Sequence, residues 1–211
     1  MGKPETDLAL RIRDKTLELL LEKEPGEIST RDIAKACGVT ATSLYYYYQD
    51  KEAILTEVKL DCITKMDEFI SGYVAKAAAK YGKAGKKWDP LLEIRTGLEG
   101  FRGWAFANPR IALLVMGRLK ANTQAKPEEL KKYYKSTDVA KVTLDKAVQA
   151  GFVFCKDTLM DANLLIAALW GAIELVLVNR TVPQYWTQRG AVNFTNKMID
   201  LLIASLASKA R

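Results

Sequence analysis

Four consecutive tyrosines, Tyr45–Tyr48, lie between Leu44 and the Asp50-Lys51 pair. A phenol or a small hydroxyl can form a single hydrogen bond with a phosphate oxygen or a base edge, and a tyrosine ring can contact the methyl group of thymine. Consecutive residues cannot share one face of a helix or a strand. The four rings must therefore differ in environment, some lying in the protein core and others facing a partner.

The chain has 211 residues, of which 49% are hydrophobic, and it contains no histidine. Histidine is the commonest metal ligand and a frequent general base, so its absence excludes Cys-His, Ser-His-Asp and histidine-based metal sites. A site made only of carboxylates would remain, but no glycine-rich phosphate loop or carboxylate motif at a helix end supports one. We therefore expect neither an enzyme nor a protein that holds a metal or another cofactor.

The three cysteines, Cys37, Cys62 and Cys155, are odd in number and far apart. This pattern fits a reducing compartment better than a disulfide framework. The N-terminal segment lacks the apolar stretch of a secretory signal, and the longest apolar run, Leu164–Val178, is too short to cross a membrane and contains Glu174. We expect a cytoplasmic protein with no membrane partner.

The formal net charge of +7 is unevenly distributed along the chain. Residues 1–60 contain 9 basic and 11 acidic side chains, whereas residues 61–211 contain 23 basic and 14 acidic ones. A nucleic-acid site in the N-terminal part would therefore depend on individual residues and helix ends, because the bulk charge there is negative.

Two short helices are predicted near the N-terminus. Ser29 and Asp32 form a capping box for a helix that ends at Gly38 after two turns, and Thr40 is expected to cap the next helix, which is equally short. Gly38 stands in the connection where a positive φ is favoured. This spacing is typical of a helix-turn-helix. Asp50 is expected to cap a long fourth helix.

Apolar residues recur every three or four positions along the rest of the chain, without sustained alternation, so the sequence predicts an all-α protein. Proline and glycine positions set most of the boundaries. Nine helices are expected, over residues 8–24, 29–37, 40–47, 51–80, 90–107, 109–120, 127–152, 158–179 and 189–208. We expect a helix-turn-helix domain over residues 1–51 and a larger helical domain over residues 52–211.

Projection of residues 41–48 at about 100° per residue separates the four tyrosines. Tyr48 and Leu44 point toward the second helix and are expected in the core. Tyr46 points outward with Thr42, and Tyr45 and Tyr47 occupy the two flanks, where a ring can be partly buried with its hydroxyl exposed. The alternative is that the outward side chains pack on a neighbouring helix.

Residues 30–55, TRDIAKACGVTATSLYYYYQDKEAIL, resemble the DNA-binding signature of TetR-type transcriptional regulators. The order Thr, Ile-Ala, Gly-Val, Leu-Tyr, Tyr-aromatic and Lys-Glu-Ala-Leu-like is in register, and the resemblance covers about 50 residues with the first helix included. It implies a nine-helix, TetR-like fold with a C-terminal domain for effector binding and dimerisation.

The resemblance also implies roles for individual residues. The phosphate contacts would be Thr30, Ser43, Tyr47 and Lys51, and the candidate base contacts would be Arg31, Ala41, Thr42 and Tyr45. Thr40 and Tyr46 complete the expected DNA-binding surface. Thr30 and Lys51 begin helices, where backbone N–H groups attract an anion, and Arg31 can form a bidentate contact with guanine or be an ordinary solvated side chain.

A single two-turn recognition helix reads few base pairs, so such modules usually bind palindromes as dimers. The helix over residues 158–179 is apolar on every side and must be buried all round. In the resembled family the last two helices pair with their copies, and we expect a homodimer through them. The alternative is that these helices form only the core of one chain.

Gly97, Gly100 and Gly103 weaken the helix over residues 90–107 and need compensation. Either a neighbouring helix packs closely, or the missing side chains leave room for a small apolar effector beside Phe101 and Trp104. Trp170 and Glu174 are further candidates for this pocket. Glu174 could instead pair with an arginine or lie at the dimer seam.

These observations together predict a ligand-responsive transcriptional regulator, a repressor that binds a palindromic DNA operator as a dimer and is released by a small apolar effector. The alternatives are a helical DNA-binding or architectural protein without an effector, and a lipophile-binding protein or carboxylate enzyme. The sequence does not indicate the effector, the operator, the regulated genes or the roles of the cysteines.

Overall fold

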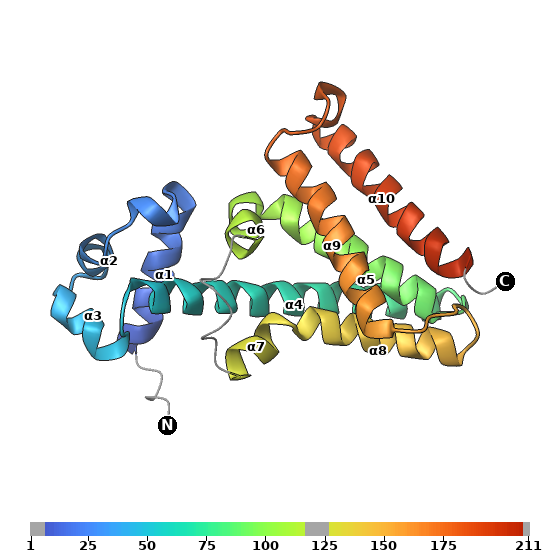
Figure 1. Ribbon diagram of the computed structural model, residues 1–211, viewed down its shortest axis with the longest axis horizontal. Coiled ribbons are helices and arrows are strands. Elements are labelled where there is room, and N and C mark those ends of the chain that lie inside the picture. The colour runs from blue at the N-terminus through green and yellow to red at the C-terminus, as the bar shows by residue number, and fades with distance from the viewer. Residues whose placement is uncertain (1–6, 117–126, 209–211) are drawn as a thin grey trace. The chain divides into compact units, whose positions relative to one another are not determined.

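Helices form nearly all the regular structure of the computed structural model, which describes residues 7–116 and 127–208 (Figure 1). The N-terminal elements are α1 (Asp7–Glu22), the 3-10 helix η1 (Pro25–Glu27), α2 (Thr30–Cys37), α3 (Ala41–Tyr47) and α4 (Lys51–Lys83). The C-terminal elements are α5 (Pro90–Ala107), α6 (Pro109–Met116), α7 (Pro127–Tyr133), α8 (Lys135–Gln149), α9 (Thr158–Leu177), the 3-10 helix η3 (Pro183–Tyr185) and α10 (Gln188–Ser208). No strand occurs within these residues, and the predicted all-α class is confirmed.

One expected helix differs from the structure. The predicted helix over residues 127–152 is divided into α7 and α8 at Tyr134, where φ is −97° and ψ is 7°. It also ends earlier than expected, at Gln149, because Gly151 adopts a positive φ of 72°. The described residues therefore contain ten α-helices where nine were expected. The expected end of the helix that begins at Pro109 lies outside the described residues.

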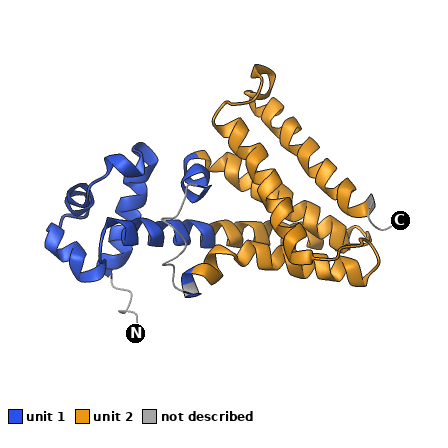
Figure 2. Ribbon diagram, in the orientation of Figure 1, with its two compact units in different colours: residues 1–64, 110–129 blue, residues 65–109, 130–211 orange. Residues whose placement is uncertain are grey.

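The chain divides into two compact units (Figure 2). Unit 1 comprises residues 1–64 and 110–129, and unit 2 comprises residues 65–109 and 130–211. The division within α4 falls between Thr64 and Lys65, and α6 joins the N-terminal helices in unit 1 from Arg110 onward. The boundary that we expected at residue 52 falls in the first turn of α4.

The core of unit 1 is aliphatic. α2 packs against α1 and α3, and the largest side chains with almost no exposed surface are Ile12, Ile28, Ile33, Leu44, Ile54 and Val58. They come from α1, the η1–α2 connection, α2, α3 and α4. The helix-turn-helix is therefore held in place by buried side chains from α1, from α4 and from the segment before α2.

In unit 2, α9 packs on α8, α10 and α5. Its inner face contributes Leu165, Leu169, Ile173 and Val176 to the core, and Gly100 of α5 lies against the ring of Tyr73, which would be 3.1 Å from a Cβ at that position. By length and composition, α9 is also the one helix of the described residues that could cross a membrane, and 33% of its apolar window is buried. The face of α9 opposite these four buried residues is exposed in the single chain.

Candidate nucleic-acid interface

The start of α2 is fixed by a reciprocal capping box, as the sequence predicted. The Ser29 backbone N–H donates to Asp32 Oδ2 (2.8 Å), the Ser29 hydroxyl donates to the same oxygen (2.6 Å), and the Asp32 N–H donates to Ser29 Oγ (3.2 Å). These hydrogen bonds hold the pKa of Asp32 below its usual value. Thr30 and Arg31 occupy the first two positions of the helix beside this cap.

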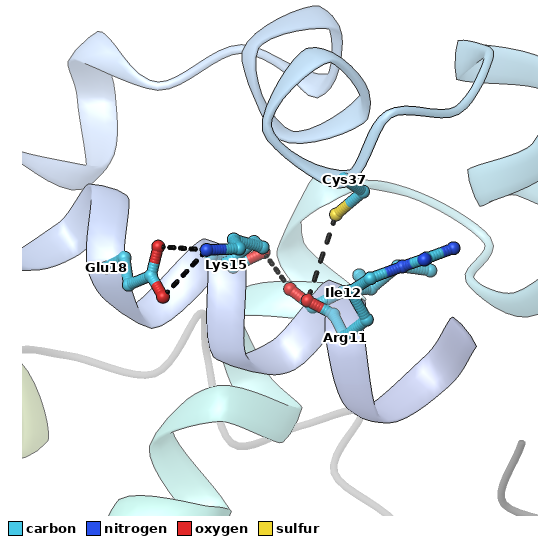
Figure 3. Close-up of polar contacts among 6 residues, drawn as sticks. Arg11, Ile12, Lys15, Glu18 and Cys37 are labelled. Atoms are coloured by element: carbon cyan, nitrogen blue, oxygen red, sulfur yellow. Dashed lines mark hydrogen bonds and ion pairs between the residues drawn. The ribbon is translucent and has the colours of Figure 1, made fainter. Parts of the chain in front are cut away.

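The end of α2 rests on α1 through Cys37 (Figure 3). The Cys37 thiol points toward the Arg11 carbonyl oxygen at 3.8 Å, and its side chain is buried next to Ile12. Burial raises the pKa of the thiol, so it stays protonated and unreactive at neutral pH. On α1, the Lys15 ammonium forms an ion pair with Glu18, with 2.7 Å between Nζ and Oε2. Cys37 is therefore a packing residue of the interface scaffold.

The turn between α2 and α3 has the predicted geometry. Gly38 adopts φ 66° and ψ 34°, and the Val39 N–H donates to the Ala34 carbonyl (3.0 Å), which completes the end of α2. Thr40 Oγ1 then accepts from the Ser43 N–H (3.3 Å) and lies 2.9 Å from the Ser43 hydroxyl. One hydroxyl of this pair donates to the other, so the second can donate toward a partner.

The four tyrosines occupy the different environments that the projection predicted. Tyr45 and Tyr46 are 55% and 66% exposed, Tyr47 is half-buried, and Tyr48 is 8% exposed. Tyr48 reaches the core by a route that the projection did not include: α3 ends at Tyr47, and Tyr48 has extended backbone angles (φ −127°, ψ 137°). The rings of Tyr46 and Tyr47 meet edge to face, with centroids 5.1 Å apart.

The other residues that we expect to contact DNA lie on or near the exposed face of α3. Arg31, Thr40 and Thr42 are exposed, and Thr30 and Ala41 are half-buried. Together with Ser43 and the outer tyrosines they provide hydroxyls, rings and one guanidinium on α2, α3 and their connection. Such groups can bind phosphate oxygens and base edges of a duplex.

Lys51 has partners that the sequence did not predict. Its ammonium donates to the carbonyl oxygens of Pro25 (3.0 Å) and Ile28 (2.9 Å). These bonds tie the first turn of α4 to the segment that precedes α2. Arg13 makes a similar connection, because its Nη1 lies 3.1 Å from Glu57 Oε1 of α4. Neither contact could be predicted from a local pattern, because the partners are separated by 23 residues or more.

The expected effector residues lie in unit 2 and are only partly brought together. Phe101 and Trp170 stack with ring centroids 5.1 Å apart and planes within 5°, and Trp104 is buried. Apart from its chain neighbours and the backbone of its own helix, no described atom lies within 4 Å of the position that a Cβ on Gly97 would occupy. Glu174 is exposed, so it does not face these rings from the core. In the described parts of both units, no cluster of residues could hold a metal ion.

The N-terminal part of the chain matches a known family. The model for bacterial regulatory proteins of the tetR family matches residues 12–58, which include α1 from Ile12 onward, the helix-turn-helix and the start of α4. The chain is also 30% identical over 112 residues to the HTH-type transcriptional regulator EthR of Mycolicibacterium smegmatis, a match that covers 53% of this chain and 48% of EthR. The match thus spans about half the length of this curated relative.

Solved structures resemble the whole fold. A bacterial regulatory protein in the tetR family from Rhodococcus RHA1 has a TM-score of 0.66 at 17% identity, covering 96% of this chain and 98% of that one. The transcriptional regulator FadR from Bacillus subtilis, solved in complex with stearoyl-CoA, has a TM-score of 0.64 at 17% identity, covering 93% and 98%. At these identities the likeness concerns the fold.

Proposed function

We propose that this chain, which belongs to the TetR family of bacterial regulatory proteins, binds an operator in duplex DNA through α2 and α3 and so represses transcription in the cytoplasm. The observation that carries the proposal is the exposed face of α3. Two large rings, Tyr45 and Tyr46, stay in solvent beside Thr42 on a helix that buries Leu44 behind them. That face fits a major groove, which admits one α-helix.

The expected contacts have two classes of role. Thr30, Ser43 and Tyr47 bind phosphates and set the position of the helix-turn-helix, whereas Arg31, Ala41, Thr42 and Tyr45 read base edges. Lys51 also binds a phosphate, with only part of its ammonium group. Two of its three N–H groups already donate to Pro25 and Ile28, so it can give one hydrogen bond to DNA while it holds the loop before α2.

The protein acts as a homodimer through the exposed face of α9. Successive turns of that face carry Met160, Leu164, Leu175 and Val178, all exposed, with Ala167 and Gly171 between them. Aliphatic side chains gain free energy when a second apolar surface covers them, and small residues allow two helices to approach closely. A dimer would present two copies of α3 to half-sites about 34 Å apart.

α10 joins this interface by the face that its own unit leaves exposed. Thr195, Ile199 and Leu206 are buried within unit 2. Leu201 is 55% exposed, and beside it Phe194 and Met198 line a groove of about 340 Å³. The proposed contact of α10 with the second copy is therefore made by the side that includes Leu201.

A small apolar effector releases the DNA by binding in unit 2, beside Gly97, Phe101, Trp104 and Trp170. FadR, a protein of this fold, was solved with stearoyl-CoA, whose acyl chain is apolar, and this supports an effector with an apolar part. Glu174 is exposed, like its neighbour Leu175. This exposure favours a place for Glu174 at the dimer seam over a place in the effector pocket. α4 belongs to both units, so a shift of this helix would change the separation of the two copies of α3.

The operator is tested by sequencing the genomic fragments that the full-length protein retains. We expect a palindrome with half-sites about one helical turn apart, bound less tightly as salt concentration rises. Retained fragments without an inverted repeat would favour the architectural alternative, and no salt-dependent DNA binding at all would favour a lipophile-binding protein. An effector that binds tightly without changing operator affinity would contradict the coupling, because linkage is reciprocal.

A further inference from the structure

The positive charge of the C-terminal part of the chain is concentrated in one segment that the proposed function does not use. Residues 61–211 have an excess of nine positive charges (23 basic against 14 acidic side chains), and five of the nine come from residues 69–88, which contain five lysines and no aspartate or glutamate. The segment comprises the end of α4 and the loop after it, both in unit 2 (Figure 2). Such a concentration of one charge attracts a polyanion.

Three of the lysines share one face of α4. Lys76, Lys80 and Lys83 recur at intervals of four and three residues, which places them above one another on the helix surface, and all three are exposed. At roughly 1.5 Å per residue, successive lysines are about 5 Å apart along the helix axis. One strand of nucleic acid has a phosphate every 3.4 Å or so of its axis, so three lysines with flexible stems match a short run of phosphates.

Two aromatic residues continue the same face toward the start of α4. Phe69 and Tyr73 precede Lys76 at the same intervals, and they are 45% and 40% exposed. Their rings are nearly parallel, with 19° between the planes and 6.4 Å between the centroids, and the Tyr73 ring also lies against Gly100 of α5. Exposed rings held in this way can stack with unpaired bases. We call the five residues of this face, from Phe69 to Lys83, the α4 stripe.

The loop after α4 adds two further cations. Lys86 and Lys87 are exposed. The Lys86 N–H donates to the Tyr81 carbonyl (3.0 Å), and its ammonium lies 5.8 Å from the centre of the Tyr81 ring. Tyr81 in turn meets Trp88 edge to face, with centroids 5.5 Å apart. These contacts hold the two lysines beside the last turns of α4.

Neither the helix dipole nor a membrane explains the whole stripe. The dipole favours cations in the last turn of a helix, which includes Lys80 and Lys83 but neither Lys76 nor the rings. A helix that lies in a membrane surface carries its aromatic residues opposite its lysines, whereas Phe69 and Tyr73 are in line with the lysines. A DNA duplex would bind the lysines and leave the rings uncovered, because its bases stack on one another.

We propose that the α4 stripe and the loop after it bind a single strand of nucleic acid. The lysines bind successive phosphates, and the two rings stack with unpaired bases. The contacts select no sequence, because every base has a face that can stack. The α4 stripe shares no residue with the proposed operator contacts, so the two proposals stand or fall separately.

The test is fluorescence anisotropy of a labelled oligothymidine of about 12 nucleotides, within the roughly 4–16 nucleotides that single-strand sites cover, titrated with the full-length protein. The variant Lys76→Gln/Lys80→Gln/Lys83→Gln should weaken binding about tenfold or more. The slope of log affinity against log salt should become shallower by about 2, since each phosphate contact contributes about 0.7.

The matched control removes the same charge from three other exposed lysines of unit 2, Lys131→Gln/Lys132→Gln/Lys156→Gln. It should leave the salt slope unchanged, because these lysines bind no phosphate. Circular dichroism establishes that both variants are folded.

Phe69→Ala tests the stacking. It should weaken oligothymidine binding about fivefold or more, as the loss of one stacked base predicts. It should leave unchanged the binding of an abasic strand of the same length, which has the phosphates without the bases. An effect of the substitution on folding would weaken the binding of both strands.

The proposal is overturned if the protein does not bind oligothymidine, if the two triple variants bind it equally, or if Phe69→Ala binds both strands like the wild type. A stripe variant that loses duplex binding as much as single-strand binding would indicate a duplex, and one that loses binding only to phosphatidylserine vesicles would indicate a membrane; either result also overturns it. The stripe variant should still retain the genomic duplex fragments that the wild type retains, so failure of the operator proposal is distinguishable.

Discussion

α3 and α9 both expose large apolar side chains, but the chemistry of the two faces differs. α3 exposes Tyr45 and Tyr46, whose hydroxyls can bind water when the surface is free and a polar partner when it is covered. α9 exposes Leu164 and Leu175, which have no such group. The first face suits a partner that binds and leaves, as an operator does, and the second suits a partner that stays, as a second copy of the chain does.

The two helices also differ in what fixes them. α3 has seven residues, too few for independent stability, and it is held by the Thr40 cap and by Leu44 in the core. α9 has 20 residues and packs on three other helices. A substitution on the inner side of α3 should therefore affect folding of its unit, whereas one on the outer side of either helix should affect only association.

The largest effect is expected from Tyr48→Ala, which removes a buried ring from behind the DNA-binding surface. Truncation of a core aromatic residue costs about 3–5 kcal/mol, so the small unit should unfold and DNA binding should be lost. Tyr46→Ala is the matched control, because the same atoms are removed from a ring that is 66% exposed. Chemical denaturation followed by circular dichroism measures both, and equal destabilisation by the two variants would contradict the assignment of the rings.

The sequence predicted the features of this region that depend on neighbouring residues. The Ser29 and Thr40 caps, the positive φ of Gly38 and the cap of α4 by Asp50, whose Oδ1 accepts from the Ala53 N–H (2.8 Å), all occur as expected. Each results from a side chain or backbone preference within three residues. Tyr48 was also placed correctly in the core, although it leaves the helix before it turns inward.

The sequence did not predict features that depend on distant residues. The bonds of Lys51 to two carbonyls and the Arg13–Glu57 pair join segments with no local pattern in common. The side of α10 that remains exposed could not be predicted either, because Ile199 and Leu201 are both large aliphatic residues and packing within unit 2 decides which is buried. Helical periodicity identifies apolar stripes, but tertiary contacts decide which stripe packs against the rest of the same chain.

The next largest effect is expected from Leu164→Glu on the outer face of α9. A carboxylate there would be buried against the second copy without a partner, so the dimer should dissociate, and sedimentation equilibrium should give the mass of one chain. Operator affinity should fall by roughly 10²- to 10⁴-fold as the linked binding of two half-sites is lost. Val139→Glu on α8 changes a similarly exposed aliphatic residue and should leave both properties intact; a dimer that survives Leu164→Glu would place the interface elsewhere.

A smaller effect is expected from Arg31→Ala on α2. If Arg31 reads a guanine, the variant should lose about 1–3 kcal/mol of discrimination at one base pair and keep its preferences at the others. Lys35→Ala removes an exposed basic residue from the same helix and should lower affinity for all sequences together or have no effect. Selection of random duplexes by each variant makes the comparison. An unchanged preference in Arg31→Ala would mean that this arginine is only a solvated side chain.

The smallest effect is expected from Tyr47→Phe, which removes one hydroxyl from the flank of α3. Since the half-buried ring remains in place against Tyr46, stability should be unchanged. Loss of a single hydrogen bond from a neutral hydroxyl to a charged phosphate should weaken binding to every sequence by about 1.5 kcal/mol. The slope of affinity against salt should not change, because a neutral hydroxyl releases no counterion. Tyr45→Phe provides the contrast, since loss of a base contact should alter the preference at one position. If both variants weakened binding uniformly, α3 would be positioned by its tyrosines and the sequence would be read by other residues.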